Sequence, residues 1–113
     1  NSETDFVARD SGFPSVADKV AGLVLGEQPA DGDALMAVTF EGKETLGEAI
    51  TRMTSKIGEK IDVRRHAVET NDGGKVVSYI HPGAKLGVLV HVSGDGDLEA
   101  AGRGVAMQVA ALN

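Results

Sequence analysis

The absences in this sequence exclude several classes of protein. No cysteine is present, so disulfides, thiolate metal sites and cysteine nucleophiles are ruled out, and we expect a cytoplasmic protein. No apolar stretch approaches the roughly 18 residues that a membrane-spanning helix needs, so no membrane is expected as a partner. One tyrosine and three phenylalanines are the only aromatic residues, so valine, leucine, isoleucine and alanine must form most of the core.

Positive charge is also scarce. The chain has 11 Lys and Arg residues against 17 Asp and Glu residues, which gives a net charge of −6. Proteins that bind a phosphate backbone carry the opposite balance, so direct nucleic-acid binding, including an RNA-binding α+β module, is disfavoured. A length of 113 residues fits a single domain over residues 1–113. Because the first residue is not methionine, we expect the chain to belong to a longer protein.

Two helices are predicted in the first half of the chain. The first follows the turn at residues 10–12 and has an apolar stripe with helical spacing, which comprises Phe13, Val16, Ala17, Val20, Leu23 and Val24. The second begins at Thr45, where Thr-x-x-Glu is a capping pattern, and stops at Gly58 in a left-handed conformation. Its predicted apolar face comprises Leu46, Ala49, Ile50, Met53 and Ile57. We interpret residues 27–42 as a surface connection with a short irregular element near 35–40.

Three strands and a third helix are predicted in the second half. Residues 61–69, 75–81 and 85–93 have strand character and are separated by short turns, which predicts a three-stranded antiparallel meander. Because residues 86–92 are nearly all apolar, we expect a central strand covered on both faces. Asp97 then caps a third helix, whose predicted inner face comprises Leu98, Ala101, Gly102, Val105, Val109 and Leu112. The expected fold class is α+β, with this sheet packed against about three helices.

Sites for a cofactor or a metal are not predicted. The chain has neither of the glycine-rich patterns that bind nucleotide phosphates. Asp95, Asp97 and Glu99 alternate like the start of a calcium loop but lack its glycine and its distal glutamate, so we interpret them as a turn and a helix cap. The three histidines are too far apart for a local ligand pair.

Covalent catalysis is not predicted either. Ser78, His81 and Asp72 offer the residue types of a hydrolytic set, but Ser78 lies inside a predicted strand with no glycines around it. We therefore expect no catalytic residues and a protein that is not an enzyme.

Two exposed or potentially exposed residues indicate recognition of another protein. His81 lies beside Pro82 at a predicted hairpin tip, where it is either a contact residue or a solvated turn residue. Phe6 follows Asp5 ahead of the first long helix. It is either part of the core or, if exposed, an apolar anchor next to a charge, which is the composition of a recognition hot spot.

Four segments together resemble one known family. Residues 1–9 (NSETDFVAR) closely resemble the Thr-Asp-Phe-Val signature of bacterial elongation factor Ts. Further similar segments follow in the same order, at residues 56–61 (KIGEKI) with 63–65, at 78–81 (SYIH) and at 85–90 (KLGVLV). The resemblance extends over nearly the whole chain.

This resemblance implies a guanine-nucleotide exchange factor for elongation factor Tu, which acts in translation elongation by disturbing the magnesium and phosphate site of its partner. The chain resembles the amino-terminal half of the family's core region, without the preceding helical module and the second core half. By resemblance, the segment near the partner's magnesium site is Thr4, Asp5, Phe6 and Val7, and the other contacts are Ile57, Gly58 and His81. No cofactor is implied.

The sequence also departs from the family pattern and leaves an alternative open. Pro82 stands where the family usually has glycine or a small residue, and His66 occupies a position that is often apolar. The alternative function is a structural or oligomerising module without exchange activity, with a homodimer formed through the core region.

Overall fold

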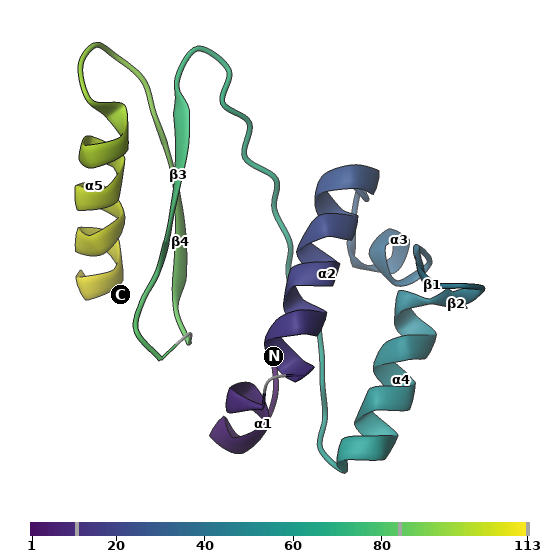
Figure 1. The fold of residues 1–113 in the computed structure, drawn as a ribbon. Helices are drawn as coiled ribbons and strands as arrows, with labels where there is room; N and C mark the ends of the chain where they lie inside the picture. Colours follow the sequence, from purple (N-terminus) through teal and green to yellow (C-terminus); the bar gives the residue numbers. More distant parts are fainter. Residues whose placement is uncertain (11, 84, 113) are drawn as a thin grey trace. The chain divides into compact units, whose positions relative to one another are not determined.

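The chain forms two compact units in a computed structural model that describes residues 1–10, 12–83 and 85–112 (Figure 1). The first unit is Asn1–Val68 and the second is Glu69–Asn113. Within the described residues there are five helices and two separate two-stranded antiparallel sheets, so the class is α+β.

The first unit is mainly helical. Its elements in chain order are α1 (Asp5–Arg9), α2 (Gly12–Glu27), α3 (Gly32–Met36), β1 (Thr39–Glu41), β2 (Glu44–Thr45) and α4 (Leu46–Ile57). Its core contains apolar side chains from four of them, namely Val20, Val24, Leu35, Phe40, Leu46 and Ala49. Both long helices therefore bury part of the stripe predicted for them. Ile57, which was expected on the inner face of α4, is an exception, because it is 44% exposed.

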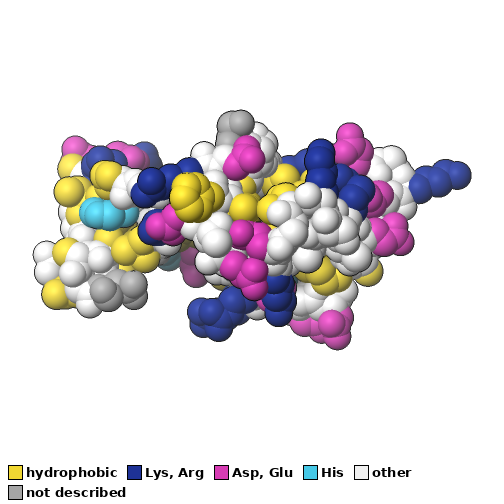
Figure 2. All heavy atoms as spheres, turned by 90° about the horizontal axis from the view of Figure 1, so that it is seen from below, with side chains coloured by type: hydrophobic (Ala, Val, Ile, Leu, Met, Phe, Trp, Pro, Cys, Tyr) yellow, Lys and Arg dark blue, Asp and Glu magenta, His cyan; other side chains and the backbone are white. Residues whose placement is uncertain are grey.

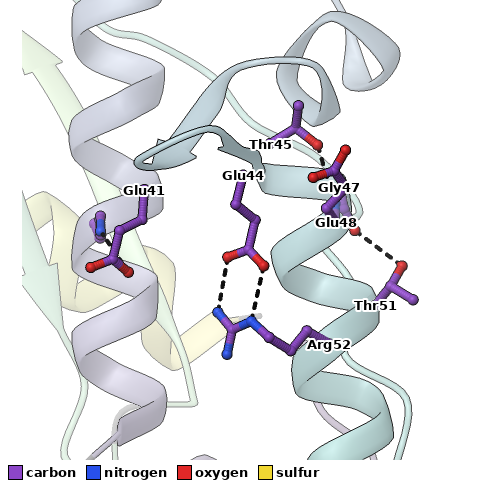
Figure 3. Close-up of polar contacts among 8 residues, drawn as sticks. Glu41, Glu44, Thr45, Gly47, Glu48, Thr51 and Arg52 are labelled. Carbon is purple, nitrogen blue, oxygen red and sulfur yellow. Dashed lines mark hydrogen bonds and ion pairs between the residues drawn. The ribbon is translucent and has the colours of Figure 1, made fainter.

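Both predicted ends of α4 are confirmed. The Thr45 hydroxyl accepts a hydrogen bond from the Glu48 N–H at 3.2 Å (Figure 3). Gly58 ends the helix with φ of 82°. The first turns are held further by Arg52, whose guanidinium donates two 3.0 Å hydrogen bonds to the Glu44 carboxylate. This pairing with Arg52 lowers the pKa of Glu44.

The connection between α2 and α4 has more regular structure than the sequence predicts. It contains α3, capped by Asp31, and a small hairpin in which Thr39 pairs with Thr45. Phe40 is buried in this hairpin, and the Lys19 ammonium lies 4.2 Å from the centre of its ring. Strands of two or three residues are too short to show a recognisable alternation, which is why the sequence did not indicate them.

The second unit is a hairpin covered by one helix. Strands β3 (Lys75–Ile80) and β4 (Gly87–Val92) are antiparallel, with a register that runs from Lys75 opposite Val92 to Ile80 opposite Gly87. Helix α5 (Leu98–Leu112) packs along both strands. These two predicted strands and the third predicted helix are confirmed.

The predicted three-stranded meander is wrong. Residues 61–69 are extended but form no strand, so β3 and β4 make a two-stranded sheet. Val63 and Val68 of this segment instead pack against the first unit's core, and Ile61 is buried. The β-branched residues that this segment buries wholly or partly, Ile61, Val63 and Val68, are also the residues favoured in strands, which explains the error.

Both predicted apolar surfaces of the second unit also need correction. Strand β4 is not covered on both faces, since every second residue is exposed and Leu89 is 53% exposed. On α5 the buried residues are Gly102, Ala106 and Ala110, whereas the larger Val105, Val109 and Leu112 are exposed. A Cβ atom on Gly102 would lie 2.6 Å from the Val77 side chain, so only a face of small residues fits against the sheet. Figure 2 shows hydrophobic side chains open to solvent on the visible surface of this unit.

Candidate partner-binding site

The segment before α2 forms the short helix α1. Thr4 is its N-cap, with extended backbone angles, and its hydroxyl accepts a 3.5 Å hydrogen bond from the Val7 N–H. Asp5 lies in the first turn, and no residue of the helix is buried. A helix of five residues is too short to be stable on its own, so contacts outside the helix must hold it.

Phe6 is almost fully exposed. Its side chain is 88% exposed, whereas Phe40 is buried and Phe13 is half-buried. The interpretation of Phe6 as a core residue is therefore excluded. Burying such a side chain is worth about 1.5–3 kcal/mol, a contribution that Phe6 does not make within this chain. An exposed aromatic residue beside Asp5 has the composition of a recognition hot spot.

The carboxylate of Glu59 holds the start of this segment. One of its oxygens accepts hydrogen bonds from the N–H groups of Glu3 and Thr4, both at 3.0 Å, and the other accepts one from the Thr4 hydroxyl at 2.7 Å. These bonds, that of the Thr4 hydroxyl above all, lower the pKa of Glu59. We call this group of three bonds the Glu59 clamp. Sequence reasoning did not single out Glu59, although it lies inside the similar segment 56–61.

The clamp brings together two of the predicted contact segments. Glu59 directly follows Gly58, so the carboxylate that holds Thr4 comes from the residue next to the Ile57–Gly58 pair. Three further bonds extend the contact, from the Lys60 N–H to the Glu3 carboxylate at 3.2 Å, from the Asp62 N–H to the Asn1 carbonyl at 3.0 Å and from the Asn1 amino group to the Asp62 carbonyl at 2.7 Å. Phe6 and Ile57 are thus two exposed apolar side chains presented by connected segments of the first unit.

His81 belongs to the second unit. It directly follows β3, and its N–H donates to the Leu86 carbonyl at 2.9 Å. Its ring Nδ1 lies 3.0 Å from the Tyr79 hydroxyl, the two rings meet edge to face, and Arg103 lies over the tyrosine ring. The imidazole is exposed, and the tyrosine gives it a defined orientation.

The comparisons with known proteins now decide the family. The family model described as "Elongation factor TS" matches residues 3–113. The chain belongs to this family. It is also similar to "Elongation factor Ts" of Xanthomonas campestris pv. campestris (strain B100), with 44% identity over 113 residues. That alignment covers 100% of this chain and 37% of the relative, so the chain spans little more than a third of its length.

Membership of the elongation factor Ts family confirms the resemblance seen in the sequence. It makes this chain part of a family of translation elongation factors. The polar residue that departs from the family pattern, His66, is half-buried, and its Nε2 lies 2.9 Å from the Pro29 carbonyl oxygen. This contact explains how a histidine is accommodated at a position that is often apolar.

Two of the three residues considered as a hydrolytic set contact other residues. The Asp72 carboxylate accepts from the Thr70 hydroxyl at 3.0 Å and the His81 ring contacts Tyr79, so each of them has a partner other than Ser78. Asp97 caps α5 by accepting from the Ala100 N–H at 3.1 Å, which confirms its interpretation as a helix cap.

The described residues hold neither a cluster of metal ligands nor a membrane-spanning helix. Among residues 1–10, 12–83 and 85–112, no three His, Asp or Glu side chains lie close enough together to hold a metal ion. None of the helices in that part of the chain has the length and hydropathy needed to cross a membrane.

Proposed function

We propose that this chain is the partner-binding, amino-terminal half of the core region of a guanine-nucleotide exchange factor for elongation factor Tu, acting in the cytoplasm during translation elongation. The observation that carries the proposal is the exposure of Phe6, 88% of its surface, on a helix that buries no residue of its own. Membership in the elongation factor Ts family supports elongation factor Tu as the proposed partner.

The chemistry of this site suits exchange without a covalent step. Phe6 would enter an apolar groove of the partner, and Asp5 would be carried with it toward the magnesium and phosphate site. Magnesium requires near-ideal octahedral coordination, so a displacement of its surroundings by about an ångström weakens its binding. Because binding couplings are reciprocal, a factor that binds the nucleotide-free partner more tightly lowers the affinity of the partner for nucleotide by the same factor.

The other predicted residues would make further contacts with the partner, from the first unit and, for His81, from the second. Thr4 and Val7 complete the segment around Phe6. Ile57 is 44% exposed beside the left-handed Gly58, and His81 is exposed with its ring held by Tyr79. These features support a role in partner binding because they combine exposed groups with fixed local conformations, which reduces the entropy lost on association.

The test is the release of a fluorescent guanine nucleotide from elongation factor Tu, with and without this chain. We expect Phe6→Ala to slow release by about tenfold or more, because the roughly 1.5–3 kcal/mol of its burial would be lost. Leu25→Ala is a matched control, since Leu25 is also apolar and exposed in the first unit but lies on α2. Equal rates for the wild-type chain and Phe6→Ala, or equal losses in both variants, would contradict the proposal.

A second candidate function is self-association as a structural or oligomerising module. It is favoured by the exposed apolar residues of the second unit, which include Ile80 and Leu89 on the hairpin and Val109 and Leu112 on α5. Sedimentation over a range of concentrations distinguishes the two candidates. A stable dimer that does not accelerate nucleotide release would favour self-association.

A further inference from the structure

We propose that Glu59 is a positioning residue, which holds the Thr4–Val7 segment beside Ile57–Gly58 so that Phe6 and Ile57 form one partner-binding surface. The inference rests on the proposed function and adds a residue that makes no contact with the partner itself. Glu59 would act through the Glu59 clamp.

The contacts of the clamp are specific for a carboxylate. An ionised carboxylate only accepts hydrogen bonds, and here its two oxygens meet three donors, namely two backbone N–H groups and one hydroxyl. Bonds to a charged acceptor are about twice as strong as bonds between neutral groups. The donors lie 55 and 56 residues before Glu59, so the clamp closes a long loop of the chain.

The clamp also sets the geometry of α1. The Thr4 hydroxyl donates its single hydrogen to Glu59, which leaves its lone pairs for the Val7 N–H. Glu59 thereby orients the cap of the helix that carries Phe6. A change of the Glu59 side chain would therefore be transmitted through Thr4 to the position of the aromatic ring.

Hydrophobic packing holds this segment only in part. Val7 and Ala8 of α1 are half-buried, but no residue of the helix is fully buried and Phe6 points its apolar surface to solvent. At the other end the chain is joined to α2 by a bond from the Phe13 N–H to the Asp10 carbonyl at 3.0 Å. The amino-terminal end thus depends on polar contacts with residues 59–62, of which the Glu59 clamp supplies three bonds.

The experiment compares Glu59→Ala and Glu59→Gln in the 113-residue chain. Nucleotide release from elongation factor Tu should slow about tenfold with Glu59→Ala, because a small displacement of a contact residue has a large effect on rate. Glu59→Gln keeps an oxygen for the two N–H groups and should slow release only about two- to threefold. The matched control is Glu41→Gln, which alters an exposed carboxylate whose ion pair is with Lys19 in the same unit. It should leave release unchanged.

Two further readouts separate positioning from a general loss of structure. Amide hydrogen exchange at Glu3 and Thr4 should become at least about tenfold faster in Glu59→Ala, with no change in the core amides of α2. In addition, Glu59→Ala combined with Phe6→Ala should slow release by less than twofold beyond Phe6→Ala alone, because coupled residues are not additive.

The same measurements separate a failure of the role proposed for Glu59 from a failure of the proposed function. If Phe6→Ala slows release but Glu59→Ala does not, the role of Glu59 is overturned and the proposed function stands. If the two substitutions have fully additive effects, Glu59 acts independently of Phe6 and the inference is likewise overturned. If Phe6→Ala leaves release unchanged, the proposed function fails, and the inference fails with it.

Discussion

The two units of this chain place apolar side chains in opposite ways. The first unit buries large residues, such as Leu35 and Leu46, and leaves Phe6 outside on a helix held by polar bonds. The second unit buries the small residues of α5 against its hairpin and leaves the larger ones outside. The difference shows that the size of an apolar side chain does not by itself decide whether it is buried. On α5 the deciding factor is how closely the helix backbone packs against the hairpin.

The largest expected effect tests the contrast between large residues in the two units. Leu46→Ala should lower the free energy of unfolding by about 2–5 kcal/mol, because it leaves a cavity at a fully buried position. Leu112→Ala, at a residue that is 77% exposed, should change it by less than about 0.5 kcal/mol. Denaturant unfolding of the whole chain measures both. Similar losses in the two variants would mean that α5 buries its larger residues after all.

A smaller effect, of opposite sign in two variants, tests the packing of small residues on α5. A new Cβ at Gly102 meets Val77 at 2.6 Å, so Gly102→Ala should cost about 1–3 kcal/mol. The space beside Gly104 is open, so Gly104→Ala should stabilise the helix by about 0.5–1 kcal/mol. The same unfolding experiment compares them. Stabilisation by both substitutions would contradict close packing at Gly102.

The smallest expected effect concerns the polar clamp of the first unit. The pKa of Glu59 lies below its ordinary value of 4.5, chiefly because the Thr4 hydroxyl binds the charged form. The Glu59 clamp therefore contributes its full stabilising free energy when the pH is above the ordinary pKa of a glutamate. This contribution is lost as the pH falls through the lowered pKa of Glu59 in the folded protein. Nuclear magnetic resonance titration of the Glu59 carboxyl should give a value below 4.5, and Thr4→Val should move it upward. A value that is identical in both proteins would show that the hydroxyl does not bind Glu59 in solution.

Much of the local structure followed from short-range patterns. Thr45 and Asp97 cap their helices, Gly58 ends α4 in the left-handed region, and β3 and β4 form the predicted hairpin. Each depends on residues within a few positions, where sequence spacing and spatial distance correspond. The motif around Phe6 was identified in the same way, from similar segments of sequence.

The errors arose where an apolar pattern had more than one structural solution. Residues 61–69 contain β-branched residues because Val63 and Val68 pack against the first unit's core, not because the segment pairs in a sheet. On α5 the stripe that contains Val105 and Val109 is the more hydrophobic one, yet Ala106 lies on the buried side. A periodic pattern identifies the apolar faces, but the steric fit to the opposite element selects among them.

By itself, then, the sequence determined the family, the three longer helices, the caps at Thr45, Gly58 and Asp97, the hairpin and the residues expected to contact a partner. Only the tertiary structure decided that Phe6 is exposed, that α5 packs by its small residues and that Glu59 holds Thr4. These three features depend on contacts between residues far apart in the chain, and their energies depend on atomic distances that spacing in the sequence does not specify.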